Sequence, residues 1–91
     1  MKIIQKVKIK NKMGLHTRPA TMIVKILQNC KSLVQFTYRN ETVNAKSILS
    51  ILMLAAKKNS SITIVCDGDD AQITMDTLTA AFENQFGEAA T

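Results

Sequence analysis

The sequence predicts an α+β fold, an open-faced β-sandwich in which a four-stranded antiparallel sheet is covered by three helices on one face. Four short segments alternate apolar and polar residues, which is typical of half-buried strands. Three longer segments repeat apolar residues every three or four positions, as amphipathic helices do. The two kinds follow one another in the order βαββαβα, and 91 residues suffice for a single domain, residues 1–91.

The first strand is expected over residues 3–10, where Val7 and Ile9 alternate with lysines. The period changes over residues 17–28, which carry the helical stripe Ala20, Ile23, Val24 and Leu27. Residues 33–38 alternate again. The polar pair Arg39-Asn40 then predicts a turn into a short strand over residues 41–43, so that these two strands form a hairpin.

The second helix opens at the segment Asn44-Ala45-Lys46-Ser47, and its inner stripe is Ile48, Ile51, Leu52 and Ala55. Its C-terminal end is expected at Lys57, Lys58 and Asn59, since cations favour the last carbonyls and Asn tolerates left-handed geometry. A strand over residues 61–66, a break at residues 67–69 and a long helix over residues 71–86 complete the order. Residues 88–91 are expected to fray.

The charges are distributed unevenly along the chain. Residues 1–58 hold all twelve Lys and Arg but only one acid, Glu41, whereas residues 59–91 hold six acids and neither cation. A basic half suits nucleic acid, an acidic protein or a phosphorylated substrate. Aromatic residues do not interleave with the lysines as a single-strand stacking platform requires, so we expect no nucleic-acid partner.

Cysteine and histidine usage excludes the common metal sites. Cys30 and Cys66 form no CxxC pair, and the single His cannot complete a usual zinc site, so no metal or cofactor is expected. Both thiols are interpreted as free and buried in a reducing compartment. With neither a signal peptide nor an 18-residue apolar run, the chain is expected to be cytoplasmic, without membrane association.

The stretch GLHTRPA, residues 14–20, contains the only histidine and the only proline of the chain. Pro19 suits the first turn of a helix, where its missing N–H is not needed, so His16 stands at a helix N-terminus. Free backbone N–H groups and the positive end of the helix dipole favour an anion there, and phosphate in particular. The Arg18 guanidinium can bind two phosphate oxygens.

Histidine at such a site is suited to carry a phosphoryl group. The helix end and Arg18 both disfavour an imidazolium, so His16 should be well populated as a neutral nucleophile. A phosphoryl group on the ring would contact the amides and Arg18. No general base or water-positioning acid lies nearby in the sequence, so the site favours holding the group over hydrolysing it. On spacing alone, a polar helix cap beside a surface arginine explains His16 equally well.

The motif GLHTRPA resembles the active-site motif of the HPr family, the histidine-containing phosphocarriers of the phosphoenolpyruvate-dependent phosphotransferase system. The segment NAKSILSILMLAAKKNSSITI resembles the family's second helix and following strand. The resemblance implies that His16 accepts phosphate on Nδ1 from enzyme I and donates it to an enzyme IIA. It also implies that Arg18 neutralises the phosphate, that the amides of Thr17 and Arg18 bind it, and that the chain is a carrier and not a stand-alone enzyme.

The resemblance further assigns a regulatory role to Ser47, because an HPr kinase phosphorylates the matching serine in many Gram-positive relatives. An ordinary N-cap serine is the alternative. The second helix is apolar beyond its inner stripe, and the family places partner contacts at Ile48, Leu49 and Leu52; a helix buried more deeply is the alternative. Lys25, Lys46 and Arg18 then steer acidic partners. A monomer is expected for such a shuttle.

Some residues depart from the family pattern. Ser50, Ala55 and Asn59 stand where several relatives carry glycine, and Ala55 is expected to stiffen the second helix. Met13 replaces a commonly polar residue. The stretches NKMGLH, ILMLAA and FENQFGE resemble NPr, the nitrogen-branch paralogue, so the sugar and nitrogen branches both stay open. A regulatory binding module that acts through Ser47 and the second helix, without sugar transport, is the alternative function.

Overall fold

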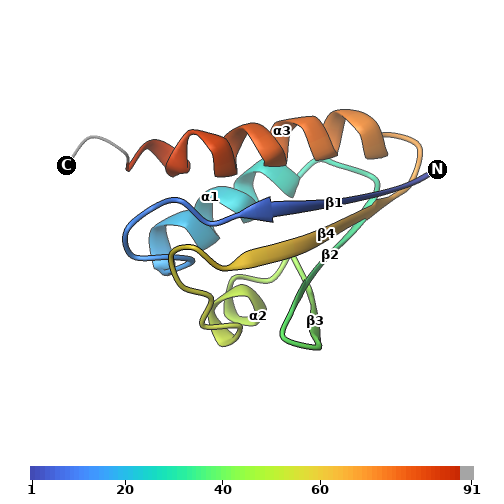
Figure 1. The fold of residues 1–91 in the computed structure, drawn as a ribbon. Coiled ribbons are helices and arrows are strands. Elements are labelled where there is room, and N and C mark those ends of the chain that lie inside the picture. The colour runs from blue at the N-terminus through green and yellow to red at the C-terminus, as the bar shows by residue number, and fades with distance from the viewer. Residues whose placement is uncertain (89–91) are drawn as a thin grey trace.

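In the computed structural model, which describes residues 1–88, four strands form one antiparallel sheet in the spatial order β1-β4-β2-β3 (Figure 1). The elements follow the predicted order βαββαβα. Their bounds are β1 Lys2–Lys8, α1 Thr17–Leu27, β2 Leu33–Tyr38, β3 Glu41–Asn44, α2 Ile48–Met53, β4 Ser61–Asp67 and α3 Ala71–Glu83, followed by the short 3-10 helix η1 Gln85–Gly87. The predicted fold class is confirmed.

The central strand β4 sets the register of the sheet. Residues Lys2 to Lys8 of β1 pair with Asp67 to Ser61, and on the other side Val34 of β2 lies opposite Cys66. The hairpin from β2 to β3 turns at Arg39 and Asn40, whose φ angles of 50° and 66° are those of a type I′ turn. The predicted hairpin is therefore present, with Tyr38 opposite Glu41.

Alternate residues of the strands point toward the helices and form the core. Val34 and Phe36 of β2 and Ile62, Ile64 and Cys66 of β4 are fully buried or nearly so. The Phe82 ring of α3 packs edge-to-face on Phe36 at a centroid distance of 5.9 Å and on Phe86 at 4.9 Å. The opposite face of the sheet leaves Ile4 and Leu33 exposed.

Strand β1 and helix α3 both end earlier than predicted. Strand β1 ends at Lys8 and not at residue 10, although Ile9 stays fully buried and its backbone bonds Ser60 and Asn59 at 2.8 Å each. Helix α3 ends at Glu83 and not at Phe86. Gln85, Phe86 and Gly87 instead have φ angles of 58°, 54° and 77°, which turn the backbone left-handed.

The predicted extent of the second helix is wrong. Helix α2 ends at Met53 with its C-cap at Leu54, and Ala55 follows with φ 52° at the position where left-handed geometry commonly closes a helix. Ala55 is exposed and lies outside the helix, so it neither belongs to an inner stripe nor stiffens α2. Lys57, Lys58 and Asn59 belong to the turn before β4 and not to a helix end.

Within residues 1–88, no helix is both long and apolar enough to cross a bilayer. The expectation of fraying falls partly on residues 89–91, which lie outside the described residues. For Glu88 it is wrong, because this side chain makes three close polar contacts.

Candidate functional site

His16 is the N-cap residue of α1. Its backbone is extended, with φ −84° and ψ −168°, and its carbonyl accepts the Ala20 amide at 3.1 Å. Pro19 is buried in the first turn, as predicted. The imidazole makes no capping hydrogen bond, so it does not play the helix-cap role that the sequence left open.

The first turn of α1 presents donors beside the imidazole. The amides of Thr17 and Arg18 have no intrahelical acceptor, because the first N–H groups of a helix precede the first hydrogen-bonded carbonyl. Both residues are exposed, so their amides and the Arg18 guanidinium are accessible to an anion. The structure therefore brings His16, Thr17 and Arg18 together at one helix end, where the dipole also favours negative charge.

The imidazole meets a carboxylate from the far end of the chain. His16 Nε2 lies 2.9 Å from Glu88 Oε2 and 3.2 Å from Glu88 Oε1. The Glu88 side chain is only 16% exposed and that of His16 29%. No acid lies near the histidine in the sequence, but the fold brings Glu88, 72 residues away, to the start of α1.

Glu88 is held by a second residue that the sequence did not single out. Asn11 Nδ2 donates to Glu88 Oε1 at 3.0 Å and to the Gly14 carbonyl at 2.7 Å, and Asn11 is fully buried. Burial favours the neutral form of the Glu88 carboxyl. Hydrogen bonds from His16 and Asn11, with the charges of His16 and Arg18, outweigh this effect and lower the pKa of Glu88. Glu88 is therefore an ionised partner of His16.

The loop before His16 is fixed against the segment that follows α2. The Leu15 amide donates to the Ala56 carbonyl at 3.0 Å, and Gly14 adopts φ 68°. A β-carbon on Gly14 would lie only 2.3 Å from the Ala56 oxygen. Glycine is thus required here both for its conformation and for the close approach.

Helix α2 begins at Ser47, whose Oγ accepts the Ser50 amide at 3.2 Å, so this serine is an N-cap. Its hydroxyl is half-buried, and Lys46 beside it directs its ammonium to the Cys30 carbonyl at 3.3 Å. Lys46 is therefore already engaged, whereas Lys25 in the last turn of α1 is exposed. The structure shows the cap role of Ser47.

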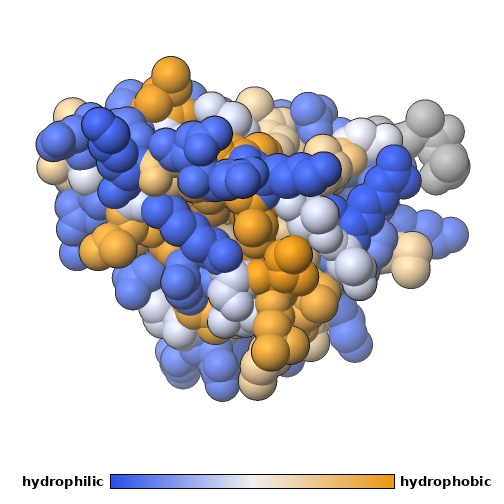
Figure 2. Space-filling view, turned by 180° about the vertical axis from the view of Figure 1, so that it is seen from behind, coloured by the Kyte–Doolittle hydropathy of each residue, from blue (hydrophilic) through white to orange (hydrophobic). Residues whose placement is uncertain are grey.

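An apolar surface lies over α2. The helix buries Ile51, and Leu54 at its C-cap is buried too, while Leu49 is 68% exposed and Ile48 37%, with Leu52 half-buried. Met53 and Met13 are also exposed. Figure 2 shows, among other apolar groups, a band of apolar side chains that reaches the lower part of the molecule, where Figure 1 places α2. We call Ile48, Leu49, Leu52 and Met53 the α2 patch.

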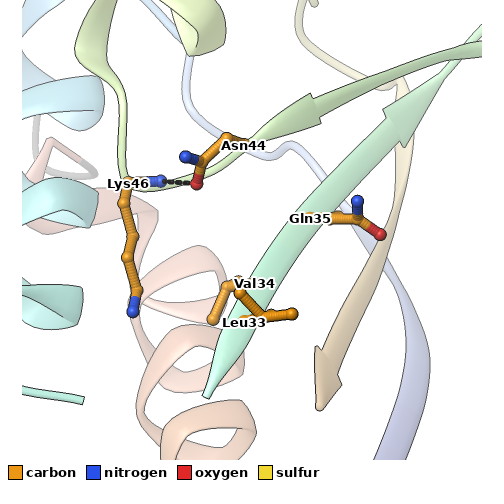
Figure 3. Close-up of a pocket in the computed structure, with 5 residues that line it drawn as sticks. All are labelled: Leu33, Val34, Gln35, Asn44 and Lys46. Carbon is orange, nitrogen blue, oxygen red and sulfur yellow. Dashed lines mark hydrogen bonds between the residues drawn. The ribbon is translucent and has the colours of Figure 1, made fainter. Parts of the chain in front are cut away.

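A separate hollow lies at the β2–β3 edge of the sheet (Figure 3). Its lining residues are Leu33, Val34, Gln35, Asn44 and Lys46. The Asn44 side chain accepts the Lys46 amide at 2.9 Å, which orders the chain before α2. None of the residues predicted to carry phosphate lines this hollow.

The two thiols differ in environment. Cys66 is fully buried in β4, and this burial, together with the nearby charges of Cys30 and Asp70, raises its pKa to about 11. Cys30 is only half-buried, which corrects the expectation that both thiols are buried. Both are free.

The chain is similar to known proteins over most of its length. A family model described as "PTS HPr component phosphorylation site" matches residues 3–84. Phosphocarrier protein HPr of Chlamydia muridarum is 44% identical over 80 residues, which cover 88% of this chain and 77% of that protein.

Two solved structures share the fold. HPr of Thermoanaerobacter tengcongensis superposes with a TM-score of 0.91 at 34% identity, covering 94% of this chain and 97% of that one. Crh, a catabolite repression protein of Bacillus subtilis described as a swapped dimer, gives a TM-score of 0.74 at 32% identity over 89% of this chain and 93% of its own.

Proposed function

This chain belongs to the HPr family of phosphocarriers of the phosphotransferase system, and we propose that His16 is the residue that carries the phosphoryl group. One observation carries the proposal. The imidazole stands at the start of α1 without capping it, next to the exposed Arg18 and the two first-turn amides. A histidine that served as a helix cap would hydrogen-bond to a first-turn amide, and this one does not. A core histidine would not stand beside an exposed arginine and free amides.

In the proposed cycle, phosphorylated enzyme I is the donor. The lone pair of His16 Nδ1 forms the new N–P bond, and the bond from phosphorus to the donor breaks, with its electron pair leaving on the donor. Arg18 and the amides of Thr17 and Arg18 bind the phosphoryl oxygens. A nucleophile of an enzyme IIA then takes the group, and the N–P electron pair returns to Nδ1. The carrier is not a stand-alone catalyst.

Incubation with phosphoenolpyruvate and enzyme I tests this role. We expect one acid-labile, base-stable phosphate per chain in the wild type and none in His16→Ala. Arg18→Ala should slow labelling, because a charge-assisted contact to phosphate is lost, whereas Arg39→Ala in the distant hairpin should label normally. Failure of the wild type to label with several enzyme I proteins would exclude the role.

The α2 patch is the proposed docking surface for enzyme I and enzyme IIA. Ile48, Leu49 and Leu52 lie on it. An exposed apolar surface beside a reactive group favours a protein partner that must reach that group. Lys25 and Arg18 add positive charge for steering acidic partners. We place this activity in the cytoplasm, where phosphoenolpyruvate is available, and in a monomer of one domain.

Regulation through Ser47 is a second candidate function, which the similarity to Crh favours. A phosphate on the Ser47 hydroxyl would add negative charge beside the α2 patch and so alter partner binding. Incubation with an HPr kinase and ATP should label Ser47 and leave Ser47→Ala unlabelled. If Ser47 is labelled from ATP while His16 is not phosphorylated by enzyme I, the result favours a purely regulatory module. It would then disfavour a carrier, whether of the sugar branch or of the nitrogen branch.

A further inference from the structure

We propose that Glu88 is a positioning residue that holds the His16 ring with its proton on Nε2, so that Nδ1 is the nitrogen that attacks phosphorus. The inference deepens the proposed phosphocarrier function and rests on it. It follows from the contact between residues 16 and 88, which lie at opposite ends of the chain.

The direction of the hydrogen bond between His16 and Glu88 determines which ring nitrogen carries the proton. An ionised carboxylate has acceptors only, and both Glu88 oxygens face His16 Nε2, at 2.9 and 3.2 Å. Nε2 must therefore be the donor. In a neutral imidazole the other nitrogen then holds the free lone pair, so the contact with Glu88 leaves Nδ1 as the nucleophile.

The carboxylate is itself held in place. Asn11 Nδ2 donates to Glu88 Oε1, and the same amide is tied to the Gly14 carbonyl in the loop before His16. Asn11 is fully buried, and its Oδ1 has no hydrogen-bond partner within residues 1–88. Such an unpaired buried oxygen is costly. The Asn11 side chain is thus oriented by its donor contacts, one of which is to Glu88.

The backbone that delivers Glu88 is strained. Gln85 and Phe86 adopt left-handed φ angles of 58° and 54°, which side chains disfavour. The buried Phe86 ring packs on Phe82 and anchors this turn, two residues before Glu88. An ion pair between Lys10 and Glu83 ties the end of α3 to the same loop.

The same contact balances charge after the transfer. When the Nδ1 lone pair forms the N–P bond, the donor keeps the electron pair of the bond that breaks, and the ring, still protonated at Nε2, becomes a phosphoimidazolium. Its positive charge faces the Glu88 carboxylate. In the onward step the acceptor's lone pair forms a bond to phosphorus, and the N–P pair returns to Nδ1. The Nε2 proton stays throughout.

Nitrogen NMR of the His16 ring in the full chain, at a pH where the ring is neutral, tests the positioning directly. We expect the Nε2–H tautomer to dominate in the wild type and the Nδ1–H tautomer to become substantial in Glu88→Ala. Glu88→Gln should fall between them, because its amide oxygen still accepts a hydrogen bond from Nε2–H but carries no charge. Asp76→Ala removes an exposed acid of α3 that has no part in placing Glu88, and it should leave the tautomers unchanged.

Transfer from phosphorylated enzyme I gives the second measurement. Glu88→Ala should lower its rate about tenfold, the size of one lost charge-assisted contact, and should give some Nε2-phosphorylated product. A wild-type tautomer ratio and rate in Glu88→Ala would overturn the inference. If the wild type is never phosphorylated, the proposed function fails, and the tautomer ratio of the unphosphorylated protein still decides whether Glu88 positions the ring.

Discussion

The Leu15 amide and the Ala56 carbonyl oxygen lie 3.0 Å apart, and their hydrogen bond joins the loop before His16 to the segment after α2. This contact helps to fix the proposed phosphate site relative to the α2 patch, which comes from a different part of the chain. A partner docked on α2 is therefore held at a fixed position relative to the imidazole.

Gly14→Ala should loosen this junction. The new methyl group would lie 2.3 Å from the Ala56 oxygen and 2.9 Å from the Lys57 α-carbon, in addition to the left-handed backbone. Strain and overlap together should lower the free energy of unfolding by about 3 kcal/mol. Gly87→Ala is the matched control, because it has φ 77° but no atom within 4 Å, and it should lose only about 1 kcal/mol. Equal losses in urea titrations would contradict the steric argument.

Ala55→Gly should stabilise the protein. Ala55 is exposed and has φ 52°, a conformation that costs alanine about 1–2 kcal/mol and glycine almost nothing. After the larger backbone entropy of glycine in the unfolded chain is subtracted, we expect a gain of about 0.5–1 kcal/mol in thermal or urea unfolding. Asn59→Gly, at φ 73°, should change stability less, because asparagine tolerates this region. A destabilised Ala55→Gly would show that the side chain is needed.

Asp70→Asn should weaken the protein at neutral pH but not in acid. The Asp70 carboxylate accepts the Lys31 amide at 2.8 Å and the Ser32 amide at 3.0 Å, and it also accepts the Ser32 hydroxyl. The Lys31 bond first, then the Ser32 hydroxyl, lower the pKa of Asp70. Because the folded pKa lies below the unfolded value of about 3.9, this stabilisation is present above that value and is lost as the pH falls through the folded pKa.

The measurement is urea unfolding of the wild type and Asp70→Asn across this range. The gap in unfolding free energy should be largest near neutral pH and should shrink as the pH falls below about 4. Asp69→Asn, an exposed neighbour, serves as the control with a small effect throughout. A gap that stays constant with pH would mean that the charge of Asp70 is unimportant.

Cys66 should resist alkylation in the native protein while Cys30 reacts. With a pKa of about 11, the Cys66 thiol is buried and largely protonated at neutral pH, whereas Cys30 is half-buried. Iodoacetamide at pH 8 followed by mass spectrometry should show Cys30 modified first. Unfolding in urea should abolish the difference. Equal native rates would indicate that β4 opens readily.

Local patterns predicted most of the fold. Residues 33–38 alternate cleanly and form β2, and the polar pair Arg39-Asn40 makes the turn that its composition indicated. The end of α2 was mispredicted because Lys57, Lys58 and Asn59 have the composition of a helix end. The chain leaves the helix earlier, at Ala55, since alanine carries no local signal for left-handed geometry.

The candidate site likewise has one part that the local sequence predicts and one part that it does not. His16, Thr17 and Arg18 are neighbours in the sequence, so one helix start suffices to bring them together. Glu88 was not foreseen, because its contact with His16 spans 72 residues and depends on two non-glycine residues in left-handed geometry. The hydrogen bond from Asn11 to Glu88 spans 77 residues, and no periodicity in the sequence encodes it.

The sheet order β1-β4-β2-β3 has a consequence for how the protein is made. Strand β4 is the last strand to be synthesised, yet it is the strand that joins β1 to the β2–β3 hairpin. A nascent chain that ends before Ser61 lacks β4. In that chain β1 has no neighbouring strand, and β2 can pair only with β3. The domain can fold only late in translation, after β4 has left the ribosome, and until then the β1 and β2 edges need protection from other chains.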